Sequence, residues 1–140
     1  MATDGSKYGQ VAVEEAASIA KRCGGELVVI SVVPSEADSP FDIVHVEMQR
    51  GLIAENEFRV AEETVRKVID MTKKEGVNAE GLILAGRPYE AIISTAREKK
   101  ADLIVMGSHG RTGLDKLLMG SVTERVIVLS PCSVLVIKIK

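Results

Sequence analysis

The stretch ADLIVMGSHGRTGLDKLLMGSVTERVIVLS, residues 101–130, passes from a short aliphatic run to a glycine-rich segment and then to a helical pattern that stops before Pro131. The run DLIVMGS is too short for a good helix and apolar almost throughout, which is typical of a strand buried on both faces. A buried strand, a glycine-rich turn and a helix in this order predict one unit of a parallel sheet with crossover helices.

The same alternation continues outward from this stretch in both directions. The other predicted elements are a helix at 6–23, a strand at 26–33, a helix at 52–75, a strand at 81–86, a helix from Pro88 to about Lys100, and a last strand at 133–140. Buried strands that alternate with helices at this spacing predict an α/β fold, with a doubly wound, open parallel sheet and helices on both faces.

The start of the chain does not complete this pattern. A further strand is needed before Ser6, where only Met1, Ala2 and Thr3 stand, so we expect a truncated first strand. A chain of 140 residues and 15.0 kDa suits a single domain over residues 1–140. The segment at 41–50 is ambiguous, and its position after a strand favours a flap over a ligand cleft.

Composition excludes several classes of function. A net charge of -2 and 3% aromatic residues argue against binding to nucleic-acid backbones and against base stacking. Cys23 and Cys132 have no spacing typical of a zinc site, so we expect two buried, reduced thiols. Because the chain has no apolar run of the roughly 20 residues that a membrane span needs, and no signal-peptide pattern, we expect a cytoplasmic protein without membrane partners.

The glycines after the strand at 102–108 indicate a phosphate site. The end of the strand leads into four glycines, at the place where ligands bind in open α/β sheets: Gly107, Gly110, Gly113 and Gly120. A backbone without Cβ atoms can approach an anion closely, and a helix that starts at Ser121 adds free amides and the positive end of its dipole. The spacing matches neither the P-loop nor the dinucleotide fingerprint.

Polar side chains in the same stretch could complete such a site. Arg111 would add a cationic fork, and the hydroxyls of Ser108, Ser121 and Thr123 would donate to phosphate oxygens. Three residues of this stretch have a purely structural alternative: Ser121 as an ordinary helix N-cap, Arg111 as a solvated loop residue, and His109 as a polar loop residue for which the sequence names no partner.

The pattern Gly107-x2-Gly110-x9-Gly120-Ser121 resembles the nucleotide-binding signature of the universal stress protein family. Met106, His109, Val122 and Thr123 extend the match, and further matching stretches cover the chain: ATDGS, ISVVP, AGRPYEAI, ADLIVMGSHGRTG and PCSVLVIK. The resemblance implies a five-stranded parallel sheet of order 3-2-1-4-5, an ATP-binding cleft, and homodimers that form by antiparallel contact of the last strands, from Val134 to Ile139.

The resemblance also implies a role for each matching position. Ala2, Thr3 and Asp4 would line the adenine and ribose side, Val32 would meet adenine, Met106 and Gly107 would flank the ribose, and Gly110, Arg111, Gly120, Ser121, Val122 and Thr123 would surround the phosphates. The structural alternatives are a turn or helix-start carboxylate for Asp4 and core packing for Val32 and Met106. The truncated first strand bears directly on the adenine side, because that strand presents Asp4.

The function that this resemblance implies is a dimeric, ATP-binding module for stress response and signalling, with Mg²⁺ accompanying the nucleotide. The loop offers donors and charge but no evident general base and no carboxylate pair for a catalytic Mg²⁺, which favours binding, with at most slow ATP hydrolysis, over metabolic catalysis. Two alternatives stay open. One is a dimeric stress protein that needs no nucleotide. The other is an adenylate-forming enzyme, which would need an SGGxDS-like loop where ATDGSKYG stands.

Overall fold

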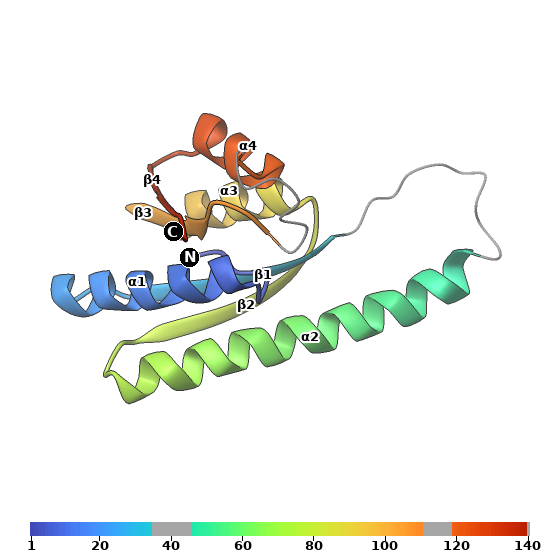
Figure 1. The fold of residues 1–140 in the computed structure, drawn as a ribbon, viewed down its shortest axis with the longest axis horizontal. Helices are drawn as coiled ribbons and strands as arrows, with labels where there is room; N and C mark the ends of the chain where they lie inside the picture. Colours follow the sequence, from blue (N-terminus) through green and yellow to red (C-terminus); the bar gives the residue numbers. More distant parts are fainter. Residues whose placement is uncertain (35–45, 111–118, 140) are drawn as a thin grey trace.

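The structure is a computed structural model that describes residues 1–34, 46–110 and 119–139. Its elements in chain order are α1 (Lys7–Cys23), β1 (Leu27–Pro34), α2 (Val46–Lys74), β2 (Ala79–Gly86), α3 (Pro88–Glu98), β3 (Leu103–Gly107), α4 (Ser121–Leu129) and β4 (Ser133–Ile137). Helices and strands alternate along the chain, as the sequence predicts, and the fold is α/β (Figure 1).

The strands form two parallel pairs, β1 with β2 and β3 with β4. Residues 1–3 lie between the pairs: the Thr3 amide donates to the Ile30 carbonyl at 2.9 Å, and the Ala2 amide donates to the Val105 carbonyl at 3.0 Å. Ala2 forms an isolated parallel bridge with Ile30. The expected first strand is therefore a single bridge, because three residues supply too few ladder hydrogen bonds for a regular strand, and the described residues form two strand pairs rather than five regular strands.

Two layers of helices cover the strands. α1 packs on β3 and β4 and α2 packs on β1 and β2, whereas α3 contacts α4, β1 and β2 on the other face (Figure 1). Side chains alternate between two apolar clusters: Val29 and Val105 pack with α1 and α2, and Ile104 and Met106 pack with α3 and α4. This alternation explains why β1 and β3 are apolar almost throughout.

The spacing of Tyr8, Ala12, Ala16, Ile19 and Cys23 by three or four residues predicts the inward face of α1, and the structure differs from it in part. Ala12 and Ala16 are buried as predicted, together with Gly9, Val13, Ala17 and Ala20, but Tyr8 and Ile19 are half-buried. Small residues bring the helix axis close to β3, so the larger side chains lie at the margin of the contact. The expectation of two buried thiols is wrong: Cys23 is exposed in the last turn of α1, and Cys132 is half-buried; both are free.

α2 begins at Val46, earlier than the predicted Leu52, and its amino-terminal half extends past the ends of the strands (Figure 1). The spacing of Phe58, Ala61 and Val65 by three or four residues predicts one buried stripe. Ala61 and Val65 are buried, but Phe58 is 38% exposed because it lies on the extending half of the helix. β2 is only half-buried, contrary to expectation, because β1 is its one neighbour among the described strands. No helix of the described residues is long and apolar enough to span a membrane.

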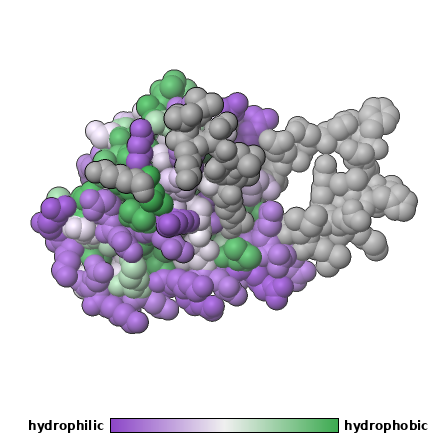
Figure 2. Space-filling view, in the orientation of Figure 1, coloured by the Kyte–Doolittle hydropathy of each residue, from purple (hydrophilic) through white to green (hydrophobic). Residues whose placement is uncertain are grey.

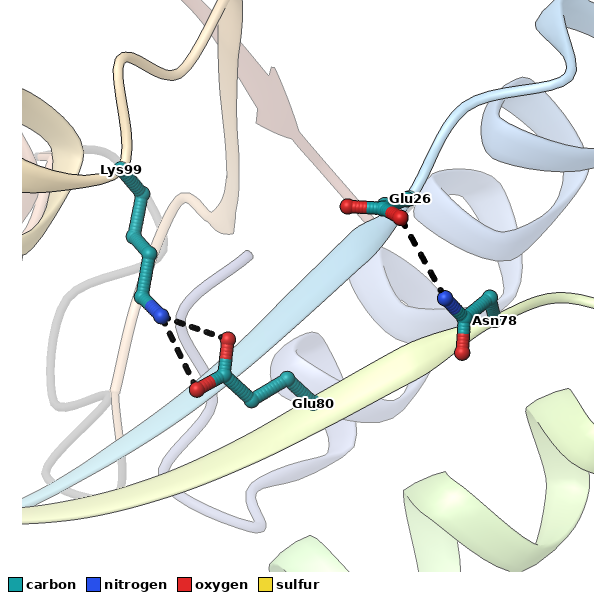
Figure 3. A network of polar contacts seen from close by, with 4 residues as sticks. All are labelled: Glu26, Asn78, Glu80 and Lys99. Atoms are coloured by element: carbon teal, nitrogen blue, oxygen red, sulfur yellow. Dashed lines mark hydrogen bonds and ion pairs between the residues drawn. The ribbon is translucent and has the colours of Figure 1, made fainter.

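Polar contacts lie near the amino-terminal ends of β1 and β2 (Figure 3). The Lys99 ammonium donates to both carboxylate oxygens of Glu80, at 2.9 and 2.7 Å, and the Asn78 amide donates to the Glu26 carboxylate at 3.4 Å. These side chains are exposed, so each contact stabilises the fold by at most about 1 kcal/mol.

Candidate functional site

A cavity of about 410 Å³ lies at the carboxyl ends of the strands, within the size range of small-molecule sites. Many of the residues predicted from the sequence line it, namely Ala2, Thr3, Asp4, Val32, Met106, Gly107, His109, Gly110, Gly120, Ser121, Val122 and Thr123. Arg111 and residues 41–45 lie outside the described residues. The cavity thus joins the end of residues 1–4, the end of β1, the end of β3 and the start of α4.

The glycines of the signature allow close contacts inside the protein. A Cβ atom on Gly107 would lie 2.8 Å from Tyr8 Cβ, and one on Gly110 would lie 2.9 Å from Asp4 Oδ2. A Cβ atom on Gly120 would lie 3.3 Å from the Ser108 carbonyl oxygen. The first glycine therefore lets α1 approach β3, the second lets the Asp4 carboxylate lie against the loop, and the third lets α4 start beside it.

Among the described residues, no side chain caps the first amides of α4. The N-cap residue is Gly120, whose own amide donates to the Ser108 carbonyl at 2.9 Å, and Ser121 is the first helical residue. The alternative of Ser121 as the N-cap is therefore wrong. Free amides at a helix start, next to a cavity, favour an anion because they donate hydrogen bonds and carry the positive end of the dipole.

The three candidate hydroxyls differ in what they contact. Thr123 Oγ1 donates to the Gly107 carbonyl at 3.0 Å, so its proton ties α4 to the end of β3 instead of pointing into the cavity. Ser108 is buried, does not line the cavity, and has its Oγ 2.9 Å from His109 Nδ1. Ser121 is exposed and lines the cavity, which leaves its hydroxyl accessible to a ligand.

His109 has neighbours that the sequence did not reveal. Its ring centroid lies 5.1 Å from that of Tyr8 in a tilted arrangement, and its Nδ1 lies beside Ser108 Oγ. Tyr8 and His109 are far apart in sequence, and no spacing pattern links them. The imidazole is therefore held at the cavity wall by a ring on α1 and a hydroxyl on its own loop.

Asp4 has a structural role as well as a place in the cavity. Its Oδ1 accepts from the Ser6 amide at 2.9 Å, and Ser6 Oγ in turn accepts from the Gly9 amide at 3.1 Å at the start of α1. Ser6 stands directly before the helical pattern, which predicts it as the N-cap, and the structure confirms this. The helix-start alternative for Asp4 thus holds together with its position in the cavity lining.

The part of the cavity lining that comes from β1, β3 and α3 includes an apolar group of side chains. Val32 and Met106 pack in the cluster shared with α3 and α4, as their core-packing alternative predicts, and they also line the cavity beside Pro88 and Ile92. Near Pro88, outside the lining, the Glu90 carboxylate accepts from the Tyr89 hydroxyl at 2.8 Å and pairs with Arg87 at 3.2 Å. These contacts hold the pKa of Glu90 below its usual value.

Sequence reasoning missed the contribution of α2. Glu57 and Ala61 line the cavity from this helix. The charged and titratable residues of the described lining are Asp4, Glu57 and His109, without a lysine or arginine among the described lining residues. In this part of the chain, attraction for an anion therefore comes from backbone amides.

Comparison with known proteins agrees with the fold. The model of the universal stress protein family matches residues 1–138. Universal stress protein MJ0531 of Methanocaldococcus jannaschii is 42% identical over 136 residues, which cover 97% of this chain and 78% of that protein. The structure of UspA from Lactobacillus plantarum superposes with a TM-score of 0.87 at 27% identity, over 98% of this chain and 94% of the other.

A further similar structure contains a nucleotide. It is a universal stress protein in complex with cAMP, with a TM-score of 0.74 and 25% identity, over 100% of this chain and 95% of the other. The sequence matches and the structural matches are to the same family, and the chain belongs to the universal stress protein family.

Proposed function

We propose that this chain binds ATP in the cavity at the carboxyl ends of its strands and acts as a nucleotide-dependent, homodimeric module in stress response and signalling. The proposal rests on one observation: three features line the same cavity, namely the loop at Gly107 and Gly110, the start of α4 with its glycine N-cap, and a group of apolar side chains. A phosphate group needs the first two features and a purine base needs the third. The cAMP complex of a similar protein supports an adenine nucleotide as the class of ligand.

The polarity of the cavity favours one orientation of the nucleotide. Gly110, Gly120 and Ser121 would surround the phosphates, because the free amides of α4 lie there. Ala2 and Val32 would contact the base and Met106 the ribose, because apolar side chains form that part of the lining. Asp4, between these two regions, would accept from the sugar or the base.

Mg²⁺ would enter with the phosphates. The described residues include no group of three or more His, Cys, Asp or Glu side chains that could hold a metal ion. A site of this kind suits Mg²⁺, which keeps several water ligands and binds through substrate phosphates. We propose at most slow hydrolysis, because the Asp4 carboxylate beside Gly110 already accepts a hydrogen bond from the Ser6 amide.

Calorimetric titration with ATP and Mg²⁺ tests nucleotide binding, after unfolding and refolding to remove any co-purified adenylate. Gly120→Val should weaken ATP binding at least about tenfold, because its branched side chain crowds the loop and displaces charge-assisted hydrogen bonds. Gly25→Val is the matched control, because the nearest atom to a Cβ there lies 4.0 Å away. Equal affinity in Gly120→Val and wild type would contradict the phosphate site.

The proposed dimer rests on the free edge at β4. β3 is its one neighbour among the described strands, and its residues Val134 and Val136 are half-buried. Ile127, Val128 and Leu129 of α4, the element just before it, are exposed, and Figure 2 shows apolar surface over α4 at the upper edge of the molecule. An apolar strand edge is rarely left unpaired, which favours antiparallel contact from Val134 to Ile139 of two copies.

Sedimentation velocity tests this interface. Val136→Asp should convert the dimer to monomer, because a carboxylate on each copy would be buried at the seam without a partner. Val60→Asp provides the control, since it adds the same charge at an exposed valine of α2. An unchanged sedimentation coefficient in Val136→Asp would place the interface elsewhere. A dimer that binds no ATP would favour the nucleotide-independent alternative.

A further inference from the structure

The inward stripe of α2 ends in a carboxylate. Going back along the helix, Thr72, Val68, Val65 and Ala61 are spaced by three or four residues and are all buried. The next position on this stripe is Glu57, which is half-buried and lines the cavity together with Ala61. An acidic residue on the core-facing stripe of an amphipathic helix has no packing reason, and it stands where the helix passes the strand ends and the cavity begins.

The two carboxylates of the lining are used differently. Asp4 accepts a hydrogen bond from the Ser6 amide. Within the part of the chain that the structure describes, no hydrogen bond or ion pair is formed by the Glu57 carboxylate, although it faces the same cavity. A half-buried carboxylate in this position is available to accept from a ligand, and such acceptors favour donors and repel phosphate.

The position of Glu57 indicates which part of a nucleotide it would meet. α2 packs on β1, whose last residues Val33 and Pro34 line the cavity beside Val32. The free amides of α4 follow β3, on the far side of residues 1–4 from β1. A nucleotide whose phosphates lie at α4 would therefore present its base to β1 and α2.

We infer that Glu57 accepts a hydrogen bond from the exocyclic amino group of adenine and thereby selects adenine over hypoxanthine. Hypoxanthine carries a carbonyl oxygen where adenine carries the amino group, so two acceptors would face each other. A mismatch of this kind lowers affinity by about tenfold, because the carboxylate loses its donor without regaining water. The inference rests on the proposed function, since it assigns the base-reading residue of the same cavity.

The test compares three nucleotides on three proteins. ATP, inosine triphosphate and deoxy-ATP, each with Mg²⁺, are titrated calorimetrically into wild type, Glu57→Gln and Glu62→Gln. We expect wild type to prefer ATP over inosine triphosphate by about tenfold. Glu57→Gln should bring this ratio close to one, because the amide can donate to the hypoxanthine carbonyl as well as accept. Glu62→Gln removes the same charge from an exposed position of α2 and should behave as wild type.

Each outcome decides between the inference and its alternatives. An unchanged ratio of ATP to inosine triphosphate in Glu57→Gln, with ATP still bound, overturns the inference but leaves the proposed function standing. A change confined to the ratio of ATP to deoxy-ATP shows that the carboxylate reads the sugar and also overturns it. A folded wild-type chain that binds none of the three nucleotides overturns the proposed function and this inference together.

Discussion

Helices α1 and α4 both begin at the carboxyl edge of the strands, yet their first turns are completed in opposite ways. In α1 the Ser6 hydroxyl accepts from the Gly9 amide at 3.1 Å, and the Asp4 carboxylate accepts from the Ser6 amide at 2.9 Å. In α4 the N-cap is Gly120, which has no side chain to accept a hydrogen bond. Within the described residues, side chains cap the start of α1, whereas the start of α4 lines a cavity without a side-chain cap; structural and ligand-binding helix starts differ in this way.

Gly107 links the two helices. Its Cα faces Tyr8 of α1 closely enough that a Cβ atom would clash, and its carbonyl accepts from the Thr123 hydroxyl of α4 at 3.0 Å. The end of β3 therefore sets the position of both helix starts. Substitutions at either helix start or at this residue separate the contacts that hold the fold from those proposed to hold a ligand.

The largest effect is expected from giving α4 a cap like that of α1. In Gly120→Asp a carboxylate would accept from the first amides of α4 and repel phosphate, so ATP affinity should fall by about 100-fold. The free energy of unfolding should be about 1 kcal/mol above that of Gly120→Ala, which places the same Cβ atom 3.3 Å from the Ser108 carbonyl oxygen, because Asp is a better N-cap than Ala. Calorimetry and urea unfolding measure the two quantities.

Gly120→Ala is the control for this change, because it adds the Cβ atom without the carboxylate. If Gly120→Asp binds ATP as tightly as Gly120→Ala does, the amides of α4 are not the phosphate ligands and the two helix starts do not differ in function.

A smaller effect, on stability, is expected at the residue between the helices. In Gly107→Ala the added methyl would lie 2.8 Å from Tyr8 Cβ and 3.0 Å from the Tyr8 carbonyl carbon, so α1 would have to move. Overpacking of this kind should lower the free energy of unfolding by about 2–3 kcal/mol. Urea unfolding measures it, with Gly25→Ala as the unstrained control. A loss equal to that of Gly25→Ala would mean that α1 does not depend on Gly107.

Thr123→Val should cost less. Valine has the shape of threonine without the hydroxyl, so the Gly107 carbonyl loses a buried donor and the free energy of unfolding should fall by about 1–2 kcal/mol. ATP affinity should change less than about threefold, since the hydroxyl proton points to Gly107 and not into the cavity. Thr123→Ser, which keeps the hydroxyl, is the control. A large loss of affinity with little loss of stability would assign Thr123 to the ligand instead.

The smallest effect is expected at the cap of α1. Ser6→Ala removes the acceptor for the Gly9 amide and should lower the free energy of unfolding by about 1 kcal/mol, while ATP affinity stays unchanged. Thermal or urea unfolding and calorimetry, carried out on the same preparation, measure both. Weaker ATP binding in Ser6→Ala would show that the cap also orients Asp4, and the contrast between the two helix starts would then be incomplete.

The order of elements and much of the candidate cavity could be predicted because they follow from local patterns. Ser6 ahead of an amphipathic run marks the start of α1, and Pro88 marks the start of α3. Ligands bind at the carboxyl ends of parallel strands, so the glycines after β3 could be placed at a site without coordinates, and the family resemblance added Val32 and Met106 to it. The early start of α2 and the exposure of Phe58 could not be predicted, because they depend on where the strands end beneath the helix.

Pairings between distant residues also lay beyond sequence reasoning. Two examples are the contact of Tyr8 with His109 and the hydrogen bond from Thr123 to Gly107. Each joins residues of different elements, so no periodic sequence pattern predicts it. Glu57 left a weak signal, as a charged residue in register with Ala61 and Val65, but an exposed helix surface would explain it equally well without the structure.

Local sequence patterns are enough to predict the alternation of helices and strands and the two-sided burial of β1 and β3, and they include the family signature around Gly107, Gly110 and Gly120. These depend on hydrophobic periodicity, caps and glycines, which act over a few residues. Three-dimensional packing is needed to see which hydroxyl faces the cavity, that α4 has a glycine as its N-cap, and that α2 brings a carboxylate to the site. Those properties depend on the packing of residues distant in the chain, which no local pattern encodes.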